Sequence, residues 1–213
     1  MHFAKFLFLF IFSVSWQGRA AAVRYDLRDP GMRNSVYFIS DAPLETVIGV
    51  TNFVSGWLEL DLANLKGPIT GEVEVDTRTF ETGMPSRNFK IREIFLGSVK
   101  QPLVTFKPSQ IIEPSAPALK PGVSVRAKVA GILSAHGMEI KMMIPVRLEL
   151  YKETPATRKR ITGGFLQVRS DFILRTPDFK LVIPAAFQGI IQPDVKFNVH
   201  MLGVERPPAG TPP

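Results

Sequence analysis

The chain has 213 residues, of which 45% are hydrophobic; it contains no cysteine and carries a formal net charge of +7. This length suffices for one domain with a sizeable core or for two small ones, and the hydrophobic fraction excludes a generally disordered protein. Without cysteine, structural disulfides and thiolate metal sites are excluded.

The N-terminus has the pattern of a secretory signal peptide. Lys5 precedes an apolar run over residues 6–16, and three alanines follow at 20–22. A basic start, a short apolar run and a small-residue cleavage site are typical of such signals. A transmembrane anchor needs about twenty apolar residues, more than this run provides. We therefore expect residues 1–22 to be removed near Ala22, leaving a periplasmic or secreted protein without a transmembrane span.

Beyond residue 22, β-forming residues and apolar–polar alternation predict several strands. Within residues 54–62, for example, Leu58 and Leu60 oppose Trp57 and Glu59. Side chains alternate across a strand, so such a segment has one apolar face and one wet face. The predicted strands of this first half are residues 23–27, 35–40, 44–50, 54–62 and 70–79.

Residues 85–96 lack the period of two. Pro85 stands at the start of this segment and Gly97 directly follows it, an asymmetry typical of helices. The pattern predicts a short helix, and its Phe95 and Leu96 supply apolar surface that must cover something. Strand character resumes at residues 101–106 and 111–112, and a loop with three prolines follows.

A long hairpin over residues 123–150 is the most regular part of the chain. Its first arm places valines on one parity, and its second arm keeps seven apolar residues from Met138 to Leu150 on one parity. His136 and Gly137 lie in the turn, where glycine supplies a positive φ. Pro145 has no N–H donor, so we expect it at a bulge or where the strand lacks a neighbour. Arms of this length favour a barrel wall over a small sandwich.

The C-terminal third contains two more predicted strands. One covers residues 161–169, residues 170–193 are less regular, and the last strand carries Val195, Phe197, Val199 and Met201 on one face. The Pro-rich tail, residues 204–213, is expected to be disordered. Eight or nine strands and one helix predict an all-β barrel or sandwich in a single domain, residues 23–203.

No constellation of residues indicates catalysis. Outside the signal, the histidines are His136 in the turn and His200 on a polar parity, 64 positions apart and in no metal-binding motif. No nucleophile elbow, Walker loop or dinucleotide fingerprint occurs. We therefore expect no enzyme activity, no metal and no cofactor. A basic run at residues 158–160 is interpreted as a solvated loop, although such a run also suits an anionic membrane or an acidic partner. Export argues against nucleic acid.

The interior of the predicted barrel has two possible states. About eight strands either fill their interior with side chains or leave one cavity for a small ligand. The inward residues are apolar, so a cavity would suit an apolar ligand. The same residues would also suit a packed core, and the sequence leaves both open.

Four stretches of the chain resemble the YceI-like, polyisoprenoid-binding, lipocalin-like proteins of bacteria. Together they span the region from about Tyr25 to Gly203, and their order and spacing carry the resemblance. The stretches are Asn34–Phe38 with Val50–Gly56, Val73–Gly83 with the helix and Gln101–Phe106, Val129–Gly137, and Arg169–Phe172.

The resemblance implies an extended antiparallel, lipocalin-like barrel of about eight strands with one short capping helix. It also implies an elongated apolar pore that holds an isoprenoid or another amphiphilic lipid. Family-motif positions with an expected structural role are Arg92, His136, Gly137, Arg169 and Asp171; the charged ones would pair near the helix or meet a headgroup.

These observations give a leading hypothesis of a periplasmic or secreted, non-enzymatic lipid carrier or sequestering protein, with a homodimer left open. One alternative is a filled barrel that acts as a surface interaction module for a protein partner or an anionic membrane. Another is an enzyme that acts on a lipid, which would need a polar cluster at the pore mouth that the sequence does not reveal. Inward parity selects the expected ligand contacts in the barrel wall, and the helix supplies two more that close the pore. They are Val125, Val129, Ile140, Met142, Ile144, Phe197 and Val199, with Phe95 and Leu96.

Overall fold

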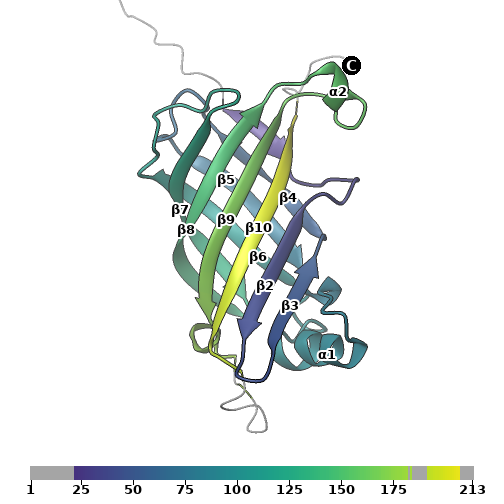
Figure 1. Ribbon diagram of the computed structural model, residues 1–213. Helices are drawn as coiled ribbons and strands as arrows, with labels where there is room; N and C mark the ends of the chain where they lie inside the picture. Colours follow the sequence, from purple (N-terminus) through teal and green to yellow (C-terminus); the bar gives the residue numbers. More distant parts are fainter. Residues whose placement is uncertain (1–21, 182, 184–190, 207–213) are drawn as a thin grey trace, which may run out of the picture.

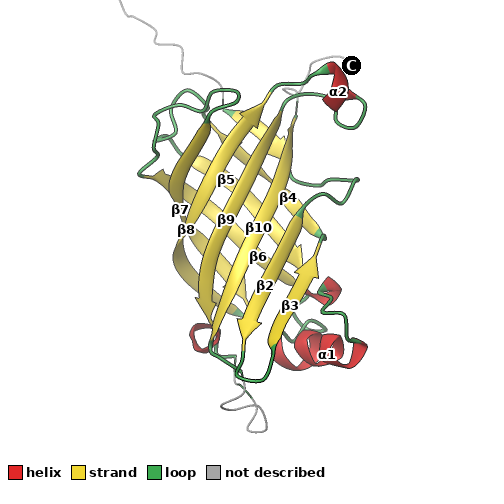
Figure 2. Ribbon diagram, viewed as in Figure 1, coloured by secondary structure: helices red, strands yellow, loops and turns green. Residues whose placement is uncertain are grey.

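The computed structural model describes residues 22–181, 183 and 191–206. Within these residues, ten strands form one antiparallel sheet that curves into a barrel (Figures 1 and 2). The strands are β1 (Val23–Asp26), β2 (Ser35–Asp41), β3 (Thr46–Thr51), β4 (Val54–Leu60), β5 (Ile69–Asp76), β6 (Leu103–Ile112), β7 (Ser124–Ala135), β8 (Met138–Tyr151), β9 (Phe165–Arg175) and β10 (Asp194–Glu205). The helical segments are η1 (Thr77–Thr79), α1 (Pro85–Phe89), η2 (Lys90–Phe95, a π-helix), α2 (Pro155–Arg158) and η3 (Thr176–Phe179).

Eight of these strands close on themselves. The order is β1-β4-β5-β6-β7-β8-β9-β10, and β1 pairs with the C-terminal end of β10 to complete the ring. The hairpin β2–β3 extends the wall, because β2 pairs with β10 farther along the same edge, at Lys196–His200. The predicted all-β barrel of about eight strands is confirmed. Figure 1 shows α1 at the end of the barrel where β2 turns into β3, and α2 at the opposite end.

The long hairpin is confirmed as β7 and β8. These strands pair from Ser124 with Glu149 to Ala135 with Met138, and the two turn residues have positive φ, 50° at His136 and 72° at Gly137. Two positive φ values in a two-residue loop define a turn whose twist matches that of the flanking strands. The sequence pattern therefore identified the two arms of the hairpin and its turn.

Strand β8 pairs with β9 over only part of its length, from Arg147 to Tyr151. Pro145 lies just outside this ladder, as expected for a residue without an N–H donor. Its carbonyl oxygen accepts a hydrogen bond from the Ser170 hydroxyl at 2.6 Å. A side chain thus satisfies a backbone group that a strand neighbour would otherwise pair.

The bounds predicted for the C-terminal strands were wrong. Strand β9 begins four residues later than expected, at Phe165, and continues to Arg175 inside the segment interpreted as irregular. In this extension Phe172 and Leu174 point inward and their neighbours point outward. Because the outward residue Ile173 is also apolar, although 55% exposed, the sequence does not show a clear apolar–polar alternation here. Strand β10 runs to Glu205, two residues beyond the predicted end of the domain.

Buried polar groups lie in and beside the loop between β1 and β2, and two of them, Asn34 and Asp29, bind neighbouring chain segments. Buried Asn34 donates to the Leu27 carbonyl oxygen at 2.6 Å and accepts from the Leu202 amide at 2.7 Å. Asp29 accepts from the backbone amide and the side chain of Arg33, and these bonds lower the pKa of its carboxyl group to about 2. The Tyr25 hydroxyl is buried without a hydrogen-bond partner among the described residues, and burial raises the pKa of this phenol.

Residues 1–21, most of the expected signal peptide, lie outside the described residues, as do residues 207–213 of the expected tail. In the described part of the chain, no helix is long and apolar enough to cross a membrane. Of the basic run at residues 158–160, Arg158 pairs with Glu153 and all three residues are exposed at the α2 end.

Candidate functional site

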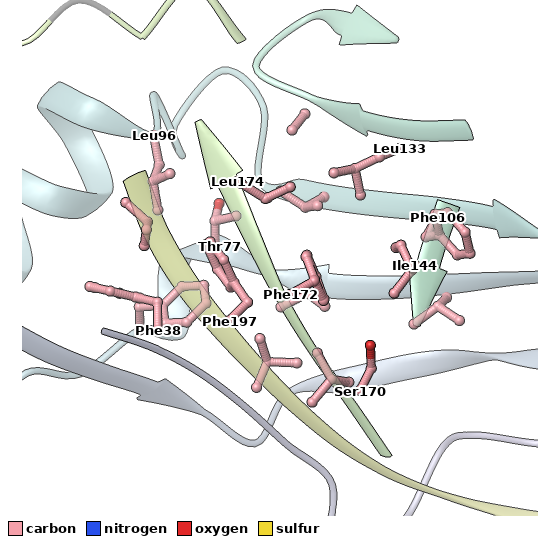
Figure 3. A pocket seen from close by; sticks show the side chains of 18 of the residues that line it. Phe38, Thr77, Leu96, Phe106, Leu133, Ile144, Ser170, Phe172, Leu174 and Phe197 are labelled. Atoms are coloured by element: carbon pink, nitrogen blue, oxygen red, sulfur yellow. The ribbon is translucent and has the colours of Figure 1, made fainter. Parts of the chain in front are cut away.

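The barrel is hollow. A cavity of about 600 Å³ lies inside it, and nearly every strand contributes side chains to its wall. Figure 3 shows side chains converging on this space, with Phe38, Phe172 and Phe197 on one side and Phe106, Leu133 and Ile144 on the other. The structure therefore does not have the filled core that the sequence left open as an alternative.

Alternate side chains of each strand line the cavity, because successive side chains of a strand point to opposite faces of the sheet. Strand β9 contributes five residues from Leu166 to Leu174, and β10 contributes four from Val195 to Met201. At about 3.3 Å per residue, the eight-residue span on β9 corresponds to roughly 26 Å along the tilted strand. The cavity is thus elongated along the barrel.

Aromatic rings form part of the wall. The rings of Phe172 and Phe197 stack with centroids 5.7 Å apart, and the Phe38 ring lies 6.2 Å from that of Phe197. Phe80 meets Phe38 edge-on at 5.4 Å. Packed rings of this kind make a rigid apolar surface.

The helical segment covers one end of the cavity, and its Ile91, Phe95 and Leu96 line the space. The predicted helix is confirmed, but it continues as a π-helix after Phe89, with the Leu96 amide donating to the Ile91 carbonyl at 2.9 Å. The wider turn brings residues five apart toward one side. Ile91 and Leu96 therefore both reach the cavity.

A polar framework fixes this helical segment to the preceding loop. The side-chain oxygen of buried Asn88 accepts from both the amide and the hydroxyl of Thr82, at 2.8 and 2.7 Å, and its amide group donates to Glu81. Arg92 donates from Nε to the Phe80 carbonyl at 2.8 Å and pairs with Glu81. Since these bonds involve the helix and the segment leading to it, they hold the cover in one position.

The opposite end of the barrel is packed solid. Its side chains have almost no exposed surface, and they come from β1, β7 and the loops that follow β1 and β4. Among them are Tyr25, Leu27, Leu65 and Val125. Among the described residues, the exposed part of the cavity lining, which includes Glu45, Met84 and Lys90, lies at the α1 end, so the cavity reaches solvent beside the helical segment that covers it.

The structure brings six of the nine expected ligand-contact residues together. They line the same cavity, namely Val129, Ile144, Phe197, Val199, Phe95 and Leu96. Their contact with a ligand stays a prediction.

The other three positions need correction, because inward parity alone does not select the cavity wall. Val125 has no exposed surface and belongs to the packed core toward the closed end. Ile140 and Met142 are half-buried near the β7–β8 turn, where β8 has left β9, and they lie outside the cavity lining.

The family-motif positions lie in two regions, some at the helix and the hairpin turn and others on the outer face of β9. Arg92 pairs near the helix, as expected, and His136 and Gly137 form the hairpin turn, with the His136 ring beside Gly97. Arg169 and Asp171 are exposed on the outward parity of β9, so neither pairing near the helix nor a headgroup contact inside the pore fits them. The ladder between β9 and β10 determines which β9 side chains point outward. The sequence prediction ended this strand at residue 169 and therefore did not assign a face to Asp171.

Sequence reasoning missed several lining residues. The β9 residues Phe172 and Leu174 would have been found by extending the alternation past the exposed Ile173. The charged lining residues, Glu45, Arg87 and Lys90, could not be found by alternation, because they come from a turn and a helix without a period of two. Within the described residues, no group of three or more His, Asp or Glu side chains is placed to hold a metal ion.

This chain was compared with protein-family models, curated proteins and solved structures. The family model of the YceI-like domain matches residues 29–202. No curated protein gives a significant match.

Among solved structures, BcnA of Burkholderia cenocepacia superposes with a TM-score of 0.61 at 16% identity, covering 80% of this chain and 96% of that one. A polyisoprenoid binding domain from Saccharophagus degradans, implicated in plant cell wall breakdown, gives 0.60 at 13% identity, covering 88% and 99%. The YceI protein of Campylobacter jejuni gives 0.57 at 14% identity, covering 76% and 86%. These likenesses establish a shared fold.

Proposed function

This chain belongs to the YceI-like domain family, and from that premise we propose that it binds an isoprenoid or another amphiphilic lipid with its apolar tail inside the barrel. The observation that carries this proposal is the elongated apolar cavity of about 600 Å³, covered at one end by α1 and η2. One structural neighbour is a polyisoprenoid binding domain, which supports the same class of ligand.

The size of the cavity gives the scale of the ligand. At about 30 Å³ for a water-sized group, a cavity of 600 Å³ holds roughly twenty such groups. Methylenes are of similar size and contribute about 0.8 kcal/mol each on leaving water, or roughly 16 kcal/mol for twenty. Association costs about 4–15 kcal/mol, so micromolar affinity, about −8 kcal/mol, lies within the expected range.

We propose a role in carrying or sequestering the lipid outside the cytoplasm. The signal-peptide pattern over residues 1–22 supports export, and the wall of the cavity, as far as the described residues form it, is mainly apolar. Cell fractionation followed by N-terminal mass determination would test the location. A mature N-terminus near residue 23 in an extracytoplasmic fraction is expected, and a full-length cytoplasmic protein would refute this part.

The lipid itself is tested by purifying the protein from its native cell without detergent, extracting it with organic solvent and analysing the extract by mass spectrometry. A stoichiometric isoprenoid or fatty amphiphile is expected. The delipidated protein should also take up a fluorescent fatty probe in titration. An empty extract together with no probe uptake would overturn lipid binding and favour an interaction through the outer surface.

A further inference from the structure

Exposed apolar side chains gather at the end of the barrel where the cavity reaches solvent. Among the described residues, Leu44 and Val99 are the most exposed large hydrophobic residues, at 83% and 79%, and Phe89 and Ile94 at the same end are 61% and 55% exposed. Leu44 lies in the turn between β2 and β3, Phe89 ends α1, Ile94 belongs to η2, and Val99 lies in the loop before β6. Figure 1 shows the β2–β3 turn and α1 at the same end. These four residues are called the apolar tips.

The helical segment has two apolar sides. Ile91 and Leu96, five positions apart, line the cavity. Phe89 and Ile94 have the same spacing but are exposed. The π-helix after Phe89 brings residues at this spacing toward one side, so the segment covers the cavity with one side and presents an apolar pair to the surroundings with another. None of the apolar tips is among the described residues that line the cavity, so packing of the interior does not explain them.

Each apolar tip has a charged neighbour in the sequence. The four pairs are Leu44 with Glu45, Phe89 with Lys90, Ile94 with Glu93, and Val99 with Lys100. The core of a protein–protein interface is depleted of charged residues, so this mixture does not suit a flat apolar contact with another protein. It suits a lipid surface, where apolar side chains enter the acyl layer while charged ones stay among the headgroups. The two acids and two bases balance, which matches zwitterionic headgroups.

A lipid surface is also the partner that a lipid-binding barrel needs during exchange. Removal of the tail from water supplies most of the affinity, so a tail that crosses water between bilayer and barrel gives up that stabilisation on the way. Contact between the bilayer and the α1 end would let the tail pass from the acyl layer to the cavity without this step. The apolar tips lie at the end where the cavity lining is exposed, as such a path requires.

We propose that the α1 end of the barrel docks on a zwitterionic lipid bilayer through the apolar tips, and that the lipid enters and leaves the cavity there. The inference rests on the proposed function, because it assigns a route to the lipid that the cavity holds. The four side chains carry about 18 carbon atoms, comparable with one myristoyl chain, whose membrane binding is reversible with a constant of about 10⁴ M⁻¹. Docking is therefore reversible, with half of the protein bound at about 0.1 mM lipid or more.

Transfer of a dansyl-labelled fatty acid from the loaded protein to phosphatidylcholine vesicles tests the contact. The transfer rate should rise in proportion to vesicle concentration, because collisions with the bilayer deliver the probe. A rate independent of vesicle concentration would mean that the probe first leaves into water, which overturns docking and leaves lipid binding intact. A protein that takes up no probe would refute the proposed function, and flotation of the empty protein with the same vesicles would then decide docking by itself.

Matched variants locate the contact. Leu44→Ser and Val99→Ser should each slow the transfer roughly three- to tenfold, because each removes apolar surface from the docked state. The affinity for the probe should stay unchanged, since neither residue lines the cavity. Val123→Ser is the control, the same change at an exposed valine beside the start of β7, where the paired end of β8 leads toward α2. Equal slowing in Val123→Ser and Val99→Ser would overturn the docking face.

Other contacts would give different results in the flotation assay. A second copy of the chain on this face would give a dimer that Leu44→Ser dissociates in light scattering, without flotation. A basic contact at the α2 end would require anionic phosphatidylglycerol vesicles, weaken with salt and be lost in Lys159→Gln but kept in Leu44→Ser. Either result would overturn the proposal. Flotation with phosphatidylcholine that changes little with salt, is lost in Leu44→Ser and persists in Lys159→Gln is the expected outcome.

Discussion

The substitution Val129→Phe tests whether the cavity is the site of tail binding. Val129 lines the cavity, whereas Val125, on the same face of β7 and four residues earlier, has no exposed surface and lies in the packed core. Substitution by phenylalanine should therefore weaken ligand binding at Val129 and lower the stability of the fold at Val125. At Val129 the added ring atoms enter empty space, and at Val125 they meet filled space.

The magnitude follows from the volume removed. Phenylalanine has four more side-chain carbons than valine, which displace about four methylene-sized groups of the ligand. At about 0.8 kcal/mol each, the binding free energy weakens by about 3 kcal/mol, or roughly a hundredfold in Kd. The free energy of unfolding of the empty Val129→Phe protein should stay within about 1 kcal/mol of the wild type or rise. Val125→Phe should lower it by about 1–3 kcal/mol.

Two assays on the same proteins decide the outcome. Displacement of a fluorescent fatty probe by farnesol measures affinity, and urea unfolding of the delipidated proteins measures stability. The folded Val125→Phe protein should bind with nearly wild-type affinity. If both variants lose the same stability and neither changes affinity, the cavity is not where the tail binds.

Three further predictions concern the closed end of the barrel. The ionised Asp29 carboxylate stabilises the fold above its ordinary pKa of 3.8, and this contribution, about 2 kcal/mol, is lost as pH falls through its folded pKa of about 2. Asp29→Asn should therefore flatten the dependence of unfolding free energy on pH between these values, and an unchanged slope in urea titrations would exclude the pairing with Arg33. Tyr25→Phe removes a buried hydroxyl without a partner among the described residues, so thermal unfolding should show unchanged or increased stability, by up to about 1 kcal/mol; a clear loss would reveal a partner such as a bound water. Asn34→Ala should lower the free energy of unfolding by about 2–3 kcal/mol, because a backbone carbonyl and a backbone amide lose their buried partner. A decrease below about 0.5 kcal/mol would mean that water replaces both bonds.

Local sequence pattern predicted most elements because each rests on interactions between near neighbours. The alternation around Ile144, the turn at His136 and Gly137, and the helix between Pro85 and Gly97 all follow from backbone preferences within a few residues. The place of Pro145 beside the end of a ladder follows in the same way. These features are confirmed in the structure.

Other features depended on which strands become neighbours. Alternation showed that Val125, Val129 and Met142 face inward, but it did not say which of them meets a packed core, a cavity or the end of a ladder. Those outcomes depend on how far β8 accompanies β9 and where the core fills, which are set by pairings between distant segments. The apolar–polar alternation is identical whether an inward side chain meets the packed core, the cavity or the end of a ladder, so alternation cannot distinguish them.

The sequence by itself determined that the chain forms long two-faced strands, one short helix and an all-β fold, because side-chain alternation and helix-end chemistry are local. Only the tertiary structure decided that the barrel is hollow, that its apolar space opens at the α1 end, and that Glu45, Arg87 and Lys90 meet there. A turn and a helix separated by about forty positions carry these three charges, and only the closure of the sheet brings them to one opening.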